Sequence, residues 1–390
     1  MRLLQNIVLV RVIVIEEAAN YSYNFKKRDY QYEHGFAEHE LDEKEENMLK
    51  EYQPDLESIL PNWSLKPIQS ERIKDVFKVN TLQGVKNLKV SPLLPRRLTF
   101  VHQAIQHLIK RGFTKMNPII PTLKGETYVS DGQYAYTLFN WIEGRQCDFA
   151  NQSELTGATR ILAELHRHTF GFIPPPHSNM RKQLGKCLYH CEERLLNLQE
   201  YQQMARQMPK ECFAQVYLKN CDYFIALATQ AVAKLKMSNY GELVNRAEIE
   251  RPFCYGDPAA RNFILTPEGR VLLIDFDSCR IDLPIMDLIK FIRRVMKKYH
   301  WSYPIARLIM DAYQTVNPIL PDELGVMKAA FYFPQKFWRI STRYFHRHGD
   351  YCPERLLRKL QKCLENKSAF YQFPFLFDNY QVNPGLNQHA

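Results

Sequence analysis

The hydrophobic pattern of residues 263–274 predicts a β-hairpin. Apolar runs at its two ends flank the turn residues 266–269, which read Thr-Pro-Glu-Gly. Short apolar runs on either side of a Pro- and Gly-containing turn are typical of two antiparallel strands. Asp257 and Asn262 precede the first run, and Asp275 follows the second. An antiparallel hairpin therefore brings these polar side chains to the same end of the two strands.

Apolar runs between residues 76 and 141 predict a small antiparallel sheet. We expect one strand at 76–79 and the next at 86–90, joined by a turn that contains Gly84. Residues 127–141 predict two further strands around a turn of Ser, Asp, Gly and Gln at 130–133. The first part of the chain is therefore expected to be built mainly of β-structure.

Helical periodicity dominates the rest of the chain. A helix is expected at 98–112, Ser153 is the predicted N-cap of the next, and residues 182–236 predict a long helical stretch broken near Pro209. The helix predicted from Asp287 to Tyr299 is amphipathic, with four apolar positions turned inward. Its basic residues are expected to form a solvated outer face: Lys290, Arg293, Arg294, Lys297 and Lys298.

The spacing of the polar residues around the hairpin suits phosphoryl transfer. Asp257 and Asn262 follow a D-x4-N spacing, and Asp275 ends the second strand in the sequence D-F-D. One Asp that receives a hydroxyl proton, with an Asn and a second Asp that bind Mg²⁺, is the arrangement found in protein kinases. Hard oxygen ligands are those that Mg²⁺ prefers. The alternative is an ordinary acidic hairpin in which Asp257 caps a turn.

This segment resembles the kinase-like phosphotransferases typified by aminoglycoside and choline kinases, whose loops read H-G-D-x4-N and I-D-F/W-D/E. The continuation D-L-P-x2-D-L at 282–288 resembles, more closely, the CotS family of bacterial spore-coat proteins. The resemblance implies an α+β, two-lobed protein-kinase-like fold, with a small antiparallel-sheet N-lobe and a larger, mostly helical C-lobe. It implies ATP and Mg²⁺ as cofactors, a nucleotide and an unknown hydroxyl acceptor as ligands, and other spore-coat proteins as partners.

The resemblance also implies roles for individual residues of the hairpin. Asp257 would be the catalytic Asp, and Asn262 and Asp275 the metal ligands. Asp287 would be a buried Asp that braces the loop. We expect Asp257 to lie in an open cleft between the lobes, with the two metal ligands beside it.

Further roles fall in the predicted sheet. Lys89 would grip the nucleotide phosphates, with a solvated strand lysine as the alternative. Phe139 and Trp141 belong to a segment that resembles the hinge between lobes, where backbone groups would hydrogen-bond an adenine. His166 ends the sequence L-A-E-L-H and is expected to be a packed, hydrogen-bonded histidine.

Three departures from the family pattern favour a second hypothesis. Tyr255 occupies the position that usually holds His, there is no G-x-G-x-x-G loop because Gly84 stands alone, and the helix at 98–112 has no acidic residue to pair with Lys89. The chain is therefore predicted to be a kinase-like phosphotransferase or, alternatively, an inactive structural coat component that retains the fold.

Composition narrows the remaining possibilities. The 390 residues are 45% hydrophobic, typical of a globular protein, and 52 basic against 42 acidic residues give a charge of +10. No nucleic-acid-binding motif accompanies this charge. The apolar stretch 7–15 is too short to span a membrane and lacks a signal-peptide cleavage site. The nine cysteines include no C-x2-C pair, so Cys187 and Cys191 are expected to be free thiols in a reducing compartment.

These observations divide the chain into four expected segments. Residues 1–40 form a poorly defined extension, 41–140 the N-lobe, 141–378 the C-lobe and 379–390 a mobile tail. Synthesis is expected in the cytoplasm of the mother cell, followed by assembly into the spore coat.

Overall fold

The computed structural model describes residues 52–73, 76–92, 94–347, 351–365 and 367–381. All of these residues belong to one compact unit of the chain, His39–Ala390. The expected N-terminal extension, 1–40, and most of the expected tail lie outside the described residues. The predicted boundary between lobes at residues 140–141 stays a prediction.

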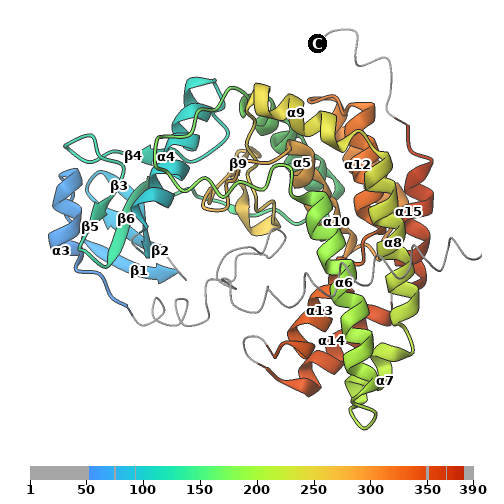
Figure 1. Cartoon of the computed structure of the whole chain (residues 1–390). Coiled ribbons are helices and arrows are strands. Elements are labelled where there is room, and N and C mark those ends of the chain that lie inside the picture. The colour runs from blue at the N-terminus through green and yellow to red at the C-terminus, as the bar shows by residue number, and fades with distance from the viewer. Residues whose placement is uncertain (1–51, 74–75, 93, 348–350, 366, 382–390) are drawn as a thin grey trace, which may run out of the picture. The chain divides into compact units, whose positions relative to one another are not determined.

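An antiparallel sheet forms the N-terminal part of this unit (Figure 1). The strand order is β1-β2-β3-β6-β4, with β5 also paired to β6. The strands are β1 Gln69–Ile73, β2 Val76–Thr81, β3 Gly84–Pro92, β4 Ile119–Ile120, β5 Val129–Ser130 and β6 Tyr134–Asn140. Both predicted turns are present, and Gly84 has a φ of +93°, a conformation that glycine adopts without strain.

Alternation along the strands gives the sheet a buried face. Val79, Leu88 and Val90 pack with Trp63 and Tyr136 in one apolar core, to which α3 (Leu56–Ile59) and η1 (Leu60–Trp63) also contribute. Because neighbouring residues of a strand point to opposite faces, Lys89 faces away from this core. Helix α4 (Pro95–Lys110) follows β3 and begins three residues before its predicted start, since Pro95 occupies the first helical position.

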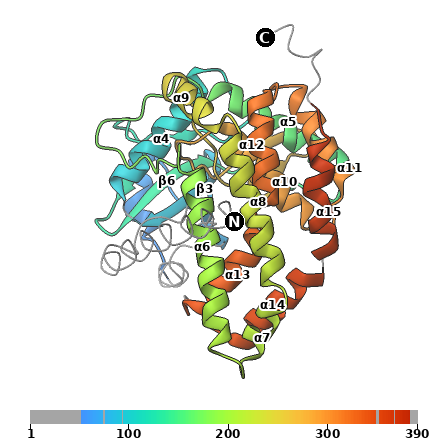
Figure 2. The same cartoon turned by 45° about the vertical axis from the view of Figure 1, so that its right-hand side comes forward.

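The C-terminal part is mainly helical (Figure 2) and also contains a small three-stranded sheet. The order β7-β8-β9 places β8 Phe263–Leu265 antiparallel to β9 Val271–Leu273, which confirms the predicted hairpin. The remaining elements are β7 Arg145–Gln146, α5 Gln152–His168, α6 Cys187–Arg206, α7 Cys212–Leu218, α8 Cys221–Met237, α9 Tyr240–Glu250, η2 Ala260–Asn262, α10 Pro284–Met296, α11 Tyr303–Gln314, α12 Pro321–Tyr332, α13 Gln335–Phe345, α14 Pro353–Glu365 and α15 Lys367–Asp378.

Two details of the helices correct or confirm the sequence analysis. The N-cap of α5 is Asn151 and not Ser153, because the Asn151 side chain accepts the amide protons of Ser153 and Glu154. The long helical stretch does break near Pro209, since α6 ends at Arg206.

The cysteines of the described residues are free thiols, and Cys187 and Cys191 are both buried. Within the same residues, no group of three or more His, Cys, Asp or Glu side chains could hold a metal ion, so these two thiols and His190 form no such site. None of the described helices is sufficiently long and apolar to cross a membrane. A small antiparallel sheet followed by a larger helical part confirms the predicted α+β class.

Candidate functional site

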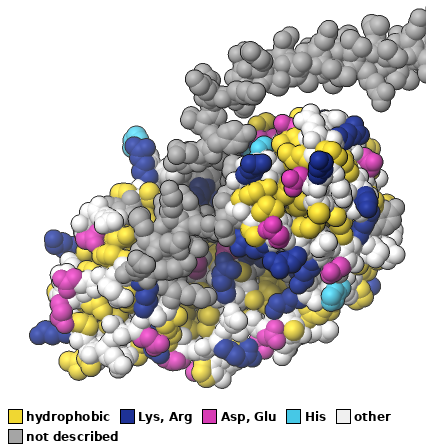
Figure 3. Space-filling view, turned by 90° about the horizontal axis from the view of Figure 1, so that it is seen from below, with side chains coloured by type: hydrophobic (Ala, Val, Ile, Leu, Met, Phe, Trp, Pro, Cys, Tyr) yellow, Lys and Arg dark blue, Asp and Glu magenta, His cyan; other side chains and the backbone are white. Residues whose placement is uncertain are grey.

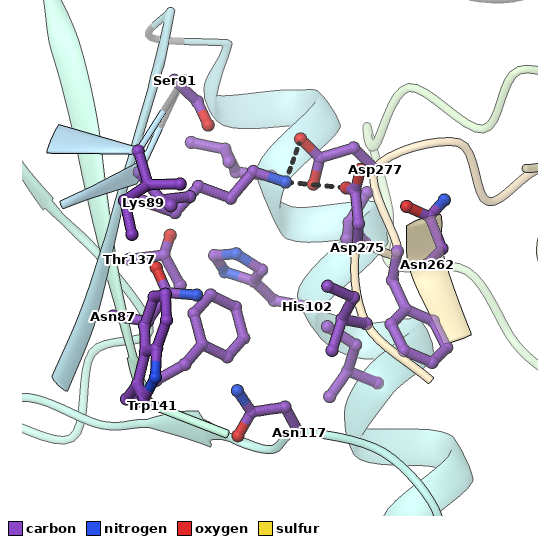
Figure 4. A pocket seen from close by; sticks show the side chains of 18 of the residues that line it. Asn87, Lys89, Ser91, His102, Asn117, Thr137, Trp141, Asn262, Asp275 and Asp277 are labelled. Carbon is purple, nitrogen blue, oxygen red and sulfur yellow. Dashed lines mark hydrogen bonds and ion pairs between the residues drawn. The ribbon is translucent and has the colours of Figure 1, made fainter. Parts of the chain in front are cut away.

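A cavity of about 810 Å³ lies between the first sheet, α4 and the β8–β9 hairpin (Figure 4). It gathers side chains from distant parts of the chain, including five of the predicted site residues: Lys89, Phe139, Trp141, Asn262 and Asp275. Asp257 is not among the described residues that line the cavity, although its neighbours Arg261 and Asn262 are. The cavity therefore unites the predicted nucleotide and metal residues and leaves the predicted catalytic Asp at its margin.

Lys89 reaches across the cavity from β3 to the hairpin. Its Nζ lies 2.8 Å from Oδ1 of Asp275 and 2.9 Å from Oδ2 of Asp277, and its side chain is only 13% exposed. Figure 4 shows both ion pairs as dashed lines. The expected position of Lys89 is thus confirmed, whereas its role in phosphate binding stays a prediction.

Asp277 is a residue to which the sequence analysis assigned no role. Helix α4 contributes Arg97, which donates to the backbone carbonyls of Asp277 and Cys279 and so fixes this segment against the helix. Burial raises the pKa of the Asp277 carboxyl, but the adjacent Lys89 ammonium and Arg97 outweigh it and hold the pKa below its usual value. The sequence D-F-D and the lack of an acidic residue on α4 were the signals that could have identified Asp277 as the partner of Lys89.

His102 also faces the cavity from α4. Its Nδ1 lies 2.6 Å from Oγ1 of Thr127. Burial lowers the pKa of His102 to about 4, so the imidazole is neutral at neutral pH. His102 therefore adds a polar wall to the cavity and no charge.

Asn262 and Asp275 meet at the open end of the hairpin, as the register predicts. The Ile274 amide donates to the Asn262 carbonyl at 3.0 Å. The side-chain amide of Asn262 donates to the carbonyl and to Oδ2 of Asp257, at 2.9 and 3.0 Å. The Asn262 oxygen is therefore left on the side of Asp275 (Figure 4). Two hard oxygen donors beside a cavity fit Mg²⁺, which commonly takes one or two protein ligands together with phosphate oxygens.

Asp275 has a strained backbone. Its φ of +60° lies in the left-handed region, which is uncommon for residues other than glycine but tolerated by Asp. Such strain persists only where the surrounding contacts determine the conformation. Here it turns the carboxylate from the end of β9 toward Lys89.

Asp257 is not open to a cleft, and that expectation was wrong. Its Oδ1 lies 2.5 Å from Nη2 of Arg294, and its Oδ2 lies 2.8 Å from Nη2 of Arg261. The Asp257 side chain is 12% exposed and that of Arg294 is 13% exposed. The physical reason is that α10 packs against the loop and supplies a buried counter-charge.

The solvated face expected for the helix at 287–299 is therefore also wrong for three of its five basic residues, although α10 itself ends at Met296. Lys290 Nζ donates to the Gly256 carbonyl at 2.6 Å, and Arg293 donates to the carbonyls of Ala330 and Phe333 at the end of α12. Lys297 and Lys298 are exposed, as expected. Asp287, Lys290 and Arg294 are spaced i, i+3 and i+7, so they share the helix face that contacts the loop.

Asp287 braces the loop as expected. It is fully buried, and both its carboxylate oxygens accept the Gly256 amide proton at 3.1 Å. It also lies 3.5 Å from Arg280 and 3.4 Å from Nε2 of His166. The other ring nitrogen of His166 lies 2.7 Å from the Tyr313 hydroxyl, which confirms that His166 is a buried, hydrogen-bonded histidine.

The loop around Gly256 is closely packed. Gly256 has a φ of +91°, and a Cβ there would lie 2.0 Å from the carbonyl oxygen of Ser278, so only glycine fits. Tyr255 is fully buried, and its hydroxyl donates to the Ile274 carbonyl at 2.5 Å. The Tyr that replaces the usual His thus ties the loop to the end of β9.

Comparison with known proteins agrees with this geometry. The model of the phosphotransferase enzyme family matches residues 64–317, which include the sheet, the cavity and the hairpin. The chain belongs to the phosphotransferase enzyme family.

Two kinds of relative accompany this family match. Spore coat protein S of Bacillus subtilis (strain 168) is a homologue, 26% identical over 273 residues that cover 70% of this chain and 77% of that protein. A crystal structure of an aminoglycoside phosphotransferase from Alicyclobacillus acidocaldarius covers 84% of this chain and 97% of its own, with a TM-score of 0.73 and 21% identity. This likeness confirms the two-lobed, kinase-like fold.

A more distant member of the same fold carries ligands. Amicoumacin kinase hAmiN, solved in complex with AMP-PNP, Ca²⁺ and Ami, covers 84% of this chain and 99% of its own. Its TM-score is 0.54 and its identity 13%, so the likeness extends to the fold alone.

Proposed function

We propose that this protein is a spore-coat-associated, kinase-like phosphotransferase of the CotS type that binds ATP and Mg²⁺ and transfers phosphate to a hydroxyl acceptor. The observation that carries the proposal is the ion pair of Lys89 with Asp275 across the cavity, at 2.8 Å, with Asn262 lining the same cavity. A nucleoside triphosphate with its metal ion requires a cation for the phosphates and oxygen donors for the metal. Here the sheet supplies the cation and the hairpin supplies two oxygen donors.

Each side chain of the site would have a separate role. When the nucleotide binds, the Lys89 ammonium would leave Asp275 and bind the phosphates, and Asp277 would keep that ammonium in place. Asn262 and Asp275 would hold Mg²⁺, which when bound neutralises the charge that develops on the phosphates. Asp257 would orient the acceptor hydroxyl and receive its proton.

Phe139 and Trp141 would contact the base of the nucleotide. The Trp141 amide already donates to the Val85 carbonyl at 3.0 Å, and the Asn140 carbonyl accepts from Asn117 at 2.8 Å. Both groups are thus used within the protein, so the contact that we propose is made by the two aromatic side chains that line the cavity.

The comparisons support this proposal at the level of the family. The amicoumacin kinase complex contains a nucleotide analogue and a metal ion in a protein of the same fold. The homology to spore coat protein S supports a location in the spore coat. Synthesis in the mother cell and assembly with other coat proteins are further parts of the proposal.

The alternative is a structural coat component that retains the fold without catalysis. Two observations favour it: Asp257 is closed off by Arg294, and the sequence contains no G-x-G-x-x-G loop to cover phosphates. Both hypotheses predict the same fold and differ in nucleotide binding and turnover.

Thermal unfolding with ATP and Mg²⁺ tests the proposal. ATP at about 100 times its dissociation constant should stabilise the protein by about 2.7 kcal/mol, and EDTA should remove the share of this stabilisation that depends on Mg²⁺. Asp275→Asn should abolish the Mg²⁺-dependent stabilisation with little change in the melting temperature of the unliganded protein. The matched surface variant Asp222→Asn should retain the Mg²⁺-dependent stabilisation. An unchanged melting temperature with ATP and Mg²⁺ would refute nucleotide binding, and binding without release of ADP would favour the structural alternative.

A further inference from the structure

Two arginines of different character hold the Asp257 carboxylate. Arg294, from α10, is 13% exposed and lies 2.5 Å from Oδ1, whereas Arg261, from the loop itself, is 58% exposed and lies 2.8 Å from Oδ2. A buried carboxylate needs one close counter-charge, and Arg294 supplies it. An exposed ion pair contributes little to stability, so Arg261 can exchange its partner at small cost.

The surroundings of Asp257 carry an excess of positive charge. Lys290 and Arg280 both donate to the Gly256 carbonyl, at 2.6 and 3.3 Å. Arg280 is neutralised by Asp282 at 3.3 Å and Asp287 at 3.5 Å, whereas Lys290 forms no such ion pair with a described residue. Burial, together with Arg280 and Arg294, lowers the pKa of Lys290 to about 7.

Basic side chains are also prominent on the surface. Figure 3 shows several Lys and Arg side chains gathered in the middle of one face of the described part. A positive field of this kind raises the local concentration of anionic ligands.

The hydrogen bonds of Asp257 decide which acceptor can reach it. Oδ1 is occupied by Arg294, and Oδ2 accepts from both Arg261 and Asn262. A hydroxyl can bind Oδ2 only if Arg261 moves away. A neutral acceptor would leave that guanidinium without its carboxylate, whereas an anionic group on the acceptor would provide a replacement.

We propose that the acceptor of this phosphotransferase carries an anionic group, of the phosphate or carboxylate class, which Arg261 binds beside Asp257. The inference rests on the proposed function and adds the chemical class of the acceptor. Arg261 lines the same cavity as Lys89 and Asp275. An anion bound to Arg261 would therefore lie next to the terminal phosphate of the nucleotide. A cationic acceptor, such as a polyamine sugar, would instead meet Arg261 and Arg294 with a charge of the same sign.

Inorganic sulfate is the probe for this site. Its dissociation constant is measured by calorimetry on the full chain saturated with AMP-PNP and Mg²⁺, with chloride keeping the ionic strength constant. Arg261→Gln should weaken sulfate binding about 10-fold, the loss expected for one charge-assisted hydrogen bond. Arg270→Gln is the matched control, because Arg270 is 74% exposed and lies on the turn of the same hairpin. This control should change the affinity by less than about twofold.

Asp257→Asn provides a test of opposite sign. It removes the charge that competes for Arg261, so sulfate should bind several-fold more tightly than to the unmodified protein. A merely structural role of Arg261 would not produce this gain. Sulfate should not displace AMP-PNP, because the nucleotide phosphates would bind Lys89 on the other side of the cavity.

Three results would overturn the inference: no measurable sulfate binding, equal binding by the Arg261→Gln variant, or displacement of AMP-PNP by sulfate, which would place the anion in the nucleotide phosphate subsite. Failure of the proposed function has a different signature. In that case AMP-PNP and Mg²⁺ would not shift the melting temperature, while the effect of Arg261→Gln on sulfate binding, measured without nucleotide, would remain.

Discussion

Removing the Asp287 carboxylate should destabilise the whole C-terminal part. Asp287→Ala leaves the Gly256 amide without an acceptor in a buried position, which costs about 1–3 kcal/mol. It also removes one of the two carboxylates beside Arg280, whose remaining partner is Asp282 at 3.3 Å. Breaking a buried ion pair costs about 3–5 kcal/mol, and this cost is smaller here because Asp282 still pairs with Arg280. We expect a total loss of about 3–5 kcal/mol in the free energy of unfolding.

Urea unfolding, followed by circular dichroism, measures this loss. The matched control is Asp222→Ala, which removes an exposed Asp from the first turn of α8 and should cost at most about 1 kcal/mol. Asp287→Asn, which keeps one acceptor oxygen and loses the charge, should fall between the two variants. A loss below about 1 kcal/mol for Asp287→Ala, equal to that of the control, would show that the loop does not depend on this carboxylate.

Acid unfolding gives an independent measurement of the same interaction. Burial raises the pKa of Asp287, but the hydrogen bond with His166 and the charge of Arg280 outweigh it and leave the pKa below the usual value. The ionised carboxylate therefore contributes stability that is fully present above about pH 4 and is lost as the pH falls through the lowered pKa. Asp287→Ala should abolish this part of the acid sensitivity; an unchanged acid profile would contradict the assignment.

Three further variants test single contacts. Asp277→Asn should raise the KM for ATP about 10-fold and change kcat less, because it frees the Lys89 ammonium to leave the cavity; an unchanged KM would exclude Asp277 as its positioning residue. Lys290→Met should flatten the rise in the free energy of unfolding between about pH 7 and 10.5, because in this range the lysine of the folded protein has lost its proton and that of the unfolded protein retains it. Urea unfolding at several pH values gives the slope of the free energy of unfolding against pH, and an unaltered slope would refute the lowered pKa. Tyr255→Phe should cost about 1 kcal/mol in urea unfolding through the loss of the bond to the Ile274 carbonyl, and a neutral result would mean that packing alone holds the loop.

Local sequence patterns were sufficient for the hairpin and for the residues at its end. The turn of Pro, Glu and Gly between two short apolar runs allows few alternative registers, and this register pairs Phe263 with Leu273. Asn262 and Asp275 then lie together as a consequence of chain geometry. The burial of Asp287 was predicted from the family resemblance.

The partners of the charged residues were decided by tertiary structure. Lys89 pairs with Asp275, which lies 186 residues later in the chain, and no local pattern carries that information. The basic residues of α10 were assigned to solvent because a lone charged side chain is usually exposed. Lys290 and Arg294 turn inward here because Asp287, on the same helix face, packs against the loop at Gly256 and brings them with it.

Periodicity along a sequence thus determined which faces of the helices and strands are apolar, since burial of apolar surface depends mainly on the residues of one element. It did not determine which charges meet, because an ion pair is stabilised only when two elements approach within a few ångströms, and that distance depends on the packing of the whole fold. Asp257 illustrates the difference. Its position in the loop follows from the sequence, but its closure by Arg294 follows from the packing of α10.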